Sequence, residues 1–106
     1  MARKSILVVD DEKSQREILE MILTEEGYRV TTVASGEAAL KIAKKRRFDL
    51  VVSDLKMRGM DGIQLLKELI ANDPYLIFIL TTAHGSIEAA KKALRHGALD
   101  FLEKPL

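Results

Sequence analysis

The stretch LVVSDLKMRGMDG, residues 50–62, joins three consecutive apolar residues to a loop that holds two aspartates and two glycines. The apolar residues predict a buried strand of a parallel sheet, because strands covered on both faces are apolar along their whole length. The strand stops at an acidic side chain, Asp54. Open parallel sheets bind their ligands beyond the carboxyl ends of the strands, so Asp54 is a candidate site residue.

Short apolar runs alternate along the chain with longer amphipathic ones. The predicted strands cover residues 6–9, 28–33, 50–52, 76–80 and 99–102. Apolar residues at helical spacing predict helices from Ser14 to Gly27, from Ser35 to residue 43, over residues 63–70, and from Ser86 to Gly97. This alternation predicts an α/β fold with a parallel sheet and helices on both faces. We expect a flavodoxin-like, doubly wound sheet of five strands in the order 2-1-3-4-5.

Length and composition restrict the class of protein. The 106 residues predict one domain covering residues 1–106. The absence of cysteine excludes disulfides and thiolate zinc sites. No apolar stretch is long enough to span a bilayer, and the N-terminus lacks a signal-peptide pattern, so we expect a cytoplasmic protein. The net charge of +1 argues neither for nor against nucleic acid.

Acidic residues also follow the first predicted strand, at Asp10, Asp11 and Glu12. In the expected strand order the first and third strands are neighbours, so Asp10, Asp11 and Asp54 would converge. Three clustered carboxylates raise one another's pKa unless a cation compensates them, and Mg²⁺ prefers such oxygen ligands. Each acid alone could simply cap the following helix, where negative charge is favourable. Helix capping accounts poorly for all three together.

The fourth and fifth predicted strands bring a hydroxyl and an ammonium to the same edge. Thr82 follows the fourth strand and Lys104 follows the fifth. Either residue alone is more often an ordinary strand-end or surface residue. Together with the carboxylates and a cation they would form a pocket for a phosphoryl group.

Four motifs at these positions resemble the response-regulator receiver domain of two-component signalling. They are VVDDE at 8–12, SDLKMRGMDG at 53–62, LTTAHG at 80–85 and DFLEKPL at 100–106. The stretches TAHG and GALDFLEKP are most similar to receivers of sigma-54-dependent transcriptional activators. The resemblance implies a domain that takes a phosphoryl group from a sensor histidine kinase and then controls an output partner, with transcription as the expected output. Such a domain catalyses its own phosphotransfer and dephosphorylation but is otherwise not an enzyme.

The resemblance implies a role for each site residue. Asp54 would be the phosphoacceptor, which makes a covalent intermediate by carboxylate attack. Mg²⁺ would be the cofactor, bound by Asp54, by Asp11 directly, by Asp10 largely through water, and by the backbone carbonyl of Lys56.

Three further positions match the switching parts of the family. Thr82 would donate a hydrogen bond to the phosphoryl oxygens, and Lys104 would pair with them. Phe101 matches the aromatic residue that turns inward when Thr82 is drawn to the phosphate. The Lys104–Pro105 peptide bond is expected to be cis.

The sequence departs from the family pattern in two places. Arg58 stands where the family usually has proline, which adds a positive charge near the site. The chain stops at Leu106, where a receiver normally continues into a fifth helix. We therefore expect a receiver cut short, without an effector domain. The sheet face that the fifth helix would cover is expected to be apolar and to join two copies of the chain in a homodimer.

Other functions compete with this interpretation. A magnesium-dependent phosphohydrolase usually has its nucleophile on strand one, a flavodoxin needs a hydroxyl- and glycine-rich loop after strand one, and an unphosphorylated interaction module would have a broken acid pocket. None of these patterns fits the sequence as well. The basic run 44–47 is expected to follow the second helix as solvated surface, with no direct contact to nucleic acid and none to a membrane.

Overall fold

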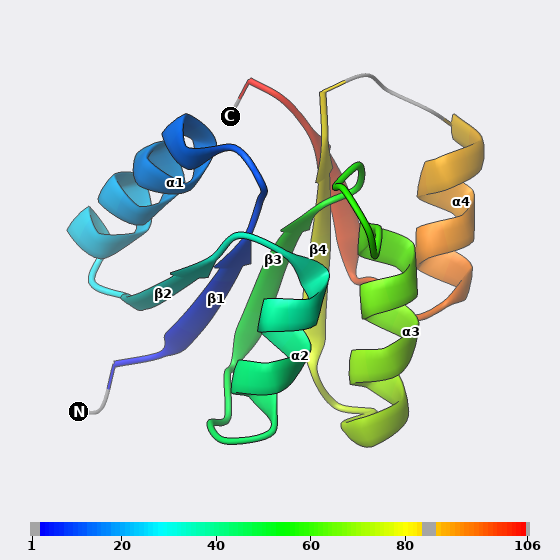
Figure 1. The fold of residues 1–106 in the computed structure, drawn as a ribbon, viewed down its shortest axis with the longest axis horizontal. Helices are drawn as coiled ribbons and strands as arrows, with labels where there is room; N and C mark the ends of the chain where they lie inside the picture. The colour runs from blue at the N-terminus through cyan, green and yellow to red at the C-terminus, as the bar shows by residue number, and fades with distance from the viewer. Residues whose placement is uncertain (1–2, 84–86, 106) are drawn as a thin grey trace.

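The computed structural model describes residues 3–83 and 87–105. Strands and helices alternate along the described chain (Figure 1). The strands are β1 (Ser5–Val9), β2 (Arg29–Val33), β3 (Leu50–Asp54), β4 (Ile77–Thr82) and β5 (Asp100–Glu103). The helices are α1 (Lys13–Glu25), α2 (Gly36–Ala43), α3 (Gly62–Asn72) and α4 (Ile87–Arg95). The α/β class predicted from the sequence is confirmed.

All five strands are parallel and lie in one sheet in the order β2-β1-β3-β4-β5. This is the predicted order. Because β1 lies beside β3, Val9 is opposite Ser53, and the residues that follow each of them meet at one edge. The first and third strands therefore bring their acidic ends together.

Three strands run further toward this edge than the sequence predicted. The third strand was expected to end at residue 52 but continues to Asp54. The fourth strand was expected to end at residue 80 but continues to Thr82, and the fifth continues to Glu103. Backbone pairing explains the difference, because Thr82 is paired with Glu103 although neither residue is apolar. The strands thus hold Thr82 and the residue before Lys104 on rigid, hydrogen-bonded backbone.

Helix ends follow local signals with one exception. Ser35 caps α2 through its Oγ, which accepts a hydrogen bond of 3.0 Å from the Ala38 N–H. Gly27 lies just beyond α1 with φ of +96°, a conformation that a side chain would strain. The prediction that Ser14 starts α1 is wrong, since the helix begins at Lys13 after an N-cap, Glu12, that makes no side-chain capping bond. Ser86 lies outside the described residues.

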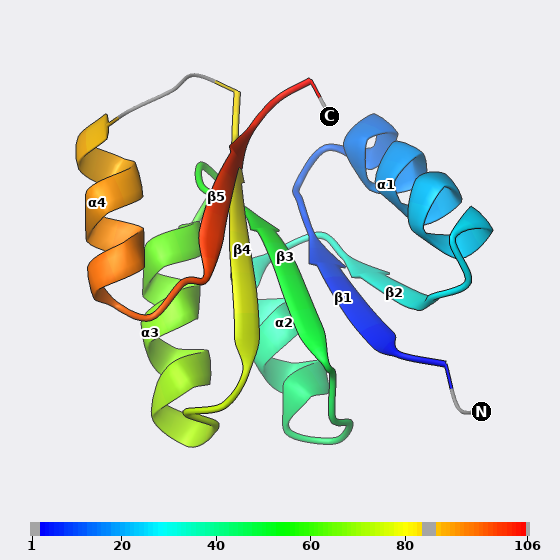
Figure 2. The same cartoon turned by 180° about the vertical axis from the view of Figure 1, so that it is seen from behind.

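Helices cover both faces of the sheet unequally. Helices α2, α3 and α4 lie on one face, over a core that includes Leu7, Val51, Leu66 and Phe78, all at most 1% exposed. Helix α1 is the one described helix on the other face, where Leu19 packs near β1 and β3. Figure 2 shows β3, β4 and β5 with no helix in front of them.

The uncovered part of the sheet carries apolar side chains. Along β4 and β5, Phe78, Leu80 and Phe101 belong to the core under α2, α3 and α4. Because side chains alternate along a strand, Ile77 and Leu102 point to the other face. Ile77 is 46% exposed and Leu102 is 40% exposed. This uncovered face, defined by Ile77, Ile79 and Leu102, is therefore an apolar surface beside α1.

Candidate functional site

Three carboxylates meet at the carboxyl edge of the sheet. Asp10 and Asp11 follow β1, and Asp54 is the last residue of β3. Each offers one oxygen atom, and these three atoms lie within 4.8 Å of one another. Asp10 is 1% exposed and Asp54 is 9% exposed, whereas Asp11 is half-buried. The convergence predicted from strand order alone is confirmed.

One ammonium group lies among these carboxylates. The Nζ of Lys104 donates a hydrogen bond of 2.8 Å to Oδ2 of Asp10 and lies 3.6 Å from Oδ1 of Asp54. Pairing of β5 with β4 brings Lys104 here, and its backbone N–H donates a 2.7 Å hydrogen bond to the carbonyl of Thr82. The lysine side chain is 10% exposed, so water screens these ion pairs little.

Burial and charge shift the protonation of both groups. Burial raises the pKa of Asp54 above its usual value, the negative charge of Asp10 raises it further, and the ammonium of Lys104 only partly offsets both. Burial alone would lower the pKa of Lys104. Its hydrogen bond to Asp10 and the charges of Asp54 and Asp10 outweigh that effect, so its pKa is raised. The lysine stays charged, whereas a charged Asp54 is costly in the site.

The other predicted site residues lie around this cluster. Thr82 ends β4 and is 4% exposed. Phe101 is half-buried on β5 and packs against the core under α2, α3 and α4. Lys56 has an exposed side chain in the loop that follows β3. The Lys104–Pro105 peptide bond is cis.

The donor set fits a hard divalent cation. Three carboxylates offer oxygen ligands, the type that Mg²⁺ prefers. They carry more negative charge than the single ammonium of Lys104 can balance, and Asp10 and Asp54 are buried. A divalent cation would neutralise the excess.

Sequence reasoning missed two contacts in the loop after β3. The backbone N–H of Arg58 donates a 3.1 Å hydrogen bond to Oδ2 of Asp11. The backbone N–H of Met60 donates a 3.3 Å hydrogen bond to Oε2 of Glu37, at the start of α2. The positive charge of Arg58 was noted in the sequence, but its partner was not. No signal in the sequence connected Glu37 with Met60.

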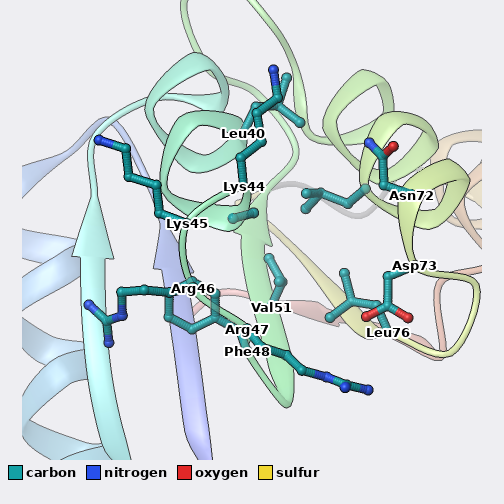
Figure 3. Close-up of a pocket in the computed structure, with 12 residues that line it drawn as sticks. Leu40, Lys44, Lys45, Arg46, Arg47, Phe48, Val51, Asn72, Asp73 and Leu76 are labelled. Carbon is teal, nitrogen blue, oxygen red and sulfur yellow. The ribbon is translucent and has the colours of Figure 1, made fainter.

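A cavity of about 600 Å³ lies at the opposite end of the sheet, between the ends of α2 and α3 (Figure 3). The basic run 44–47 follows α2, as predicted, and lines the cavity. Arg46 lies over the Phe48 ring at 5.2 Å and hydrogen-bonds Thr31. Figure 3 shows Lys45 and Arg46 pointing toward β2 and Arg47 pointing away from them. The cationic groups of this run therefore point in different directions, and the carboxylates of Asp10, Asp11 and Asp54 do not line the cavity.

Among the described helices, none has the length and apolar character needed to cross a membrane.

A family model described as "Response regulator receiver domain" matches residues 6–106. The chain is 48% identical over 101 residues to the transcriptional regulatory protein ZraR of Escherichia coli O157:H7. The match covers 95% of this chain and 23% of ZraR, so the chain spans about a quarter of that relative's length.

Solved structures agree with the sequence comparison. The solution structure of the beryllofluoride-activated NtrC4 receiver domain dimer is 40% identical, with a TM-score of 0.91, and the match covers 96% of this chain and 84% of that one. The crystal structure of the CheX-CheY-BeF3-Mg+2 complex from Borrelia burgdorferi is 34% identical, with a TM-score of 0.93 and coverage of 97% and 79%. The whole described fold is therefore shared with these proteins.

Proposed function

Since the chain belongs to the response regulator receiver domain family, we propose that it takes a phosphoryl group from a sensor histidine kinase onto Asp54. The observation that carries this proposal is the grouping of Asp10, Asp11 and Asp54 around one buried ammonium, that of Lys104. A strand-end carboxylate that is costly to keep charged is suited to act as a nucleophile. Two-component signalling is the pathway class to which such domains belong.

The transfer needs one bond to form and one to break. A carboxylate oxygen of Asp54 attacks the phosphorus of a phosphohistidine, the P–N bond breaks, and its electron pair returns to the imidazole nitrogen. Lys104, already 3.6 Å from Asp54, would pair with the oxygens of the phosphoryl group, and the Thr82 hydroxyl would donate to them. Bound Mg²⁺, held by Asp10, Asp11, Asp54 and the Lys56 carbonyl, would supply further positive charge for those oxygens.

The output follows from a change in charge. Phosphorylation adds negative charge beside Thr82, and we propose that movement of Thr82 and Phe101 carries this change to the surface. The partner is a downstream effector, and transcription is the output that the name of the relative ZraR supports. We place the domain in the cytoplasm, with no catalysis beyond its own phosphotransfer and dephosphorylation, and with no direct contact to nucleic acid.

Intact-mass measurement tests the phosphotransfer. After incubation with acetyl phosphate and Mg²⁺, the protein should gain the mass of one phosphoryl group. The gain should disappear when EDTA replaces Mg²⁺ and should be absent from the Asp54→Asn variant. A folded protein that gains no mass under any of these conditions would instead support an interaction module that is never phosphorylated.

We further propose that a second copy of this chain binds the uncovered face. The apolar side chains of Ile77 and Leu102 support this, and an NtrC4 receiver dimer shows that a similar domain associates with itself. Size-exclusion chromatography with light scattering should find dimers, and Ile77→Lys should shift them toward monomers. Tyr75→Lys is the matched control, because Tyr75 is 90% exposed and lies before β4. A monomer at all concentrations would refute the dimer.

A further inference from the structure

Arg58 makes two contacts with a carboxylate of the acidic cluster. Its backbone N–H lies 3.1 Å from Oδ2 of Asp11, and its guanidinium Nε lies 3.7 Å from the same oxygen. The two residues are 47 positions apart in the sequence. The Arg58 side chain is 91% exposed and that of Asp11 is 21% exposed. One residue therefore places both a hydrogen-bond donor and a positive charge on Asp11.

The loop that carries Arg58 is held by other contacts as well. Met60 N–H bonds to Glu37, and Gly62 N–H donates a 2.8 Å hydrogen bond to the carbonyl of Leu55. Asp61 and Gln64 form a reciprocal capping box at the start of α3. These bonds do not involve the Arg58 side chain. Removing the guanidinium should therefore leave the loop folded, and its effect should fall on Asp11.

The contact acts against cation binding. A divalent cation at the cluster is attracted by the negative charge of Asp11, and the guanidinium neutralises part of that charge. The Arg58 N–H also occupies a lone pair of Oδ2, so this oxygen is a poorer ligand. The three acids assigned to Mg²⁺ are thus not equivalent. Asp10 and Asp54 lie beside the ammonium of Lys104, whereas Asp11 lies beside the guanidinium of Arg58.

We propose that Arg58 is a built-in competitor for the divalent cation and lowers the Mg²⁺ affinity of the site through Asp11. This inference rests on the proposed function, which makes the cluster a Mg²⁺ site. Occupancy of the site, and with it phosphorylation of Asp54, would then need a higher free Mg²⁺ concentration than it would without the arginine. The residue that determines this sensitivity lies in the loop and is not itself a ligand.

Titration of the ¹⁵N-labelled protein with MgCl₂, followed by NMR, measures the dissociation constant directly. Arg58→Ala removes the guanidinium and keeps the N–H, and we expect it to bind Mg²⁺ about two- to fivefold more tightly, as suits an exposed ion pair. Arg58→Pro removes the N–H as well and should bind more tightly still. Arg58→Lys, which keeps the charge, should lie closest to the unchanged protein.

Two controls separate the local contact from a change in net charge. Arg47→Ala removes an arginine at the opposite end of the sheet and should leave the dissociation constant unchanged. Raising the salt concentration should shrink the difference between Arg58→Ala and the unchanged protein, because salt screens exposed charges.

The outcomes distinguish this inference from the proposed function. If the unchanged protein binds Mg²⁺ and Arg58→Ala binds it equally or more weakly, the competitor role is overturned and the proposed function stands. If the unchanged protein binds no Mg²⁺, both fail together. Because Arg58→Ala keeps the backbone donor, misfolding of the proline variant would not remove the test.

Discussion

The Asp54→Asn variant should take up no phosphoryl group, yet it should be more stable than the unchanged protein at neutral pH without Mg²⁺. An amide is a very poor nucleophile, so the reaction is lost. The amide also carries no charge, whereas the buried carboxylate lies beside Asp10 and its pKa is raised. The substitution thus removes the reaction together with the cost of a buried charge.

The gain in stability should depend on pH in a defined direction. The native pKa of Asp54 lies above the ordinary value of 3.8 for an aspartate, so between these two pKa values the native state binds more protons than the unfolded state. The cost of the charge is absent below the unfolded pKa, grows as pH rises between the two, and is complete above the native one. The difference between the variant and the unchanged protein should therefore shrink as pH falls toward 4.

Urea unfolding at several pH values, in EDTA, measures this difference in the free energy of unfolding. Glu68→Gln is the matched control, because it removes one negative charge from an exposed position on α3. It should show no comparable gain. An Asp54→Asn variant that is less stable than the unchanged protein at neutral pH would show that the Lys104 ion pair outweighs the cost of burying the carboxylate.

Gly62→Ala should strongly destabilise the protein. A Cβ at this position would collide with the carbonyl oxygen of Asp54, and it would lie 2.8 Å from Cδ1 of Leu80 and 3.1 Å from Cα of Leu55. Two of these atoms belong to the backbone around the site and cannot turn aside. We expect a loss of about 2–4 kcal/mol in the free energy of unfolding. The melting temperature should fall by roughly 10 °C or more.

Gly36→Ala provides a control at an equivalent position. Gly36 is the first residue of α2, as Gly62 is of α3, and each follows a capping residue. The three atoms nearest to a Cβ at Gly36 would all belong to the side chain of Met60, the closest at 3.0 Å. That side chain is flexible, so the melting temperature should fall much less. Equal falls for both variants, measured by circular dichroism, would rule out the backbone clash as the cause.

The parts of this fold that could be predicted from sequence are those governed by local periodicity. Apolar runs such as residues 50–52, and the spacing of apolar residues in the helices, are sufficient to predict the strands and helices and their order along the chain. Strand ends such as Thr82 were misplaced, because pairing with Glu103 extends the ladder into polar residues. Apolar pattern carries no information about such pairing.

The site was predictable to the extent that it follows from strand order. Asp10, Asp11 and Asp54 lie at strand ends, so the sheet alone brings them together. The contacts of Arg58 with Asp11 and of Met60 with Glu37 depend on the path of a loop. A loop path depends on tertiary packing, so these two contacts had to be seen in the structure.

The ion pair between Lys104 and Asp10 joins residues 94 positions apart. Nearly the whole chain lies between them in sequence, so the pair forms only after all five strands have been synthesised and have paired in the sheet. During translation, a chain that ends before residue 104 holds its carboxylates without their ammonium partner. If Asp54 is the phosphoacceptor, as proposed above, a partly made chain lacks the lysine that would pair with the phosphoryl group, and the site would become complete only when the sheet does.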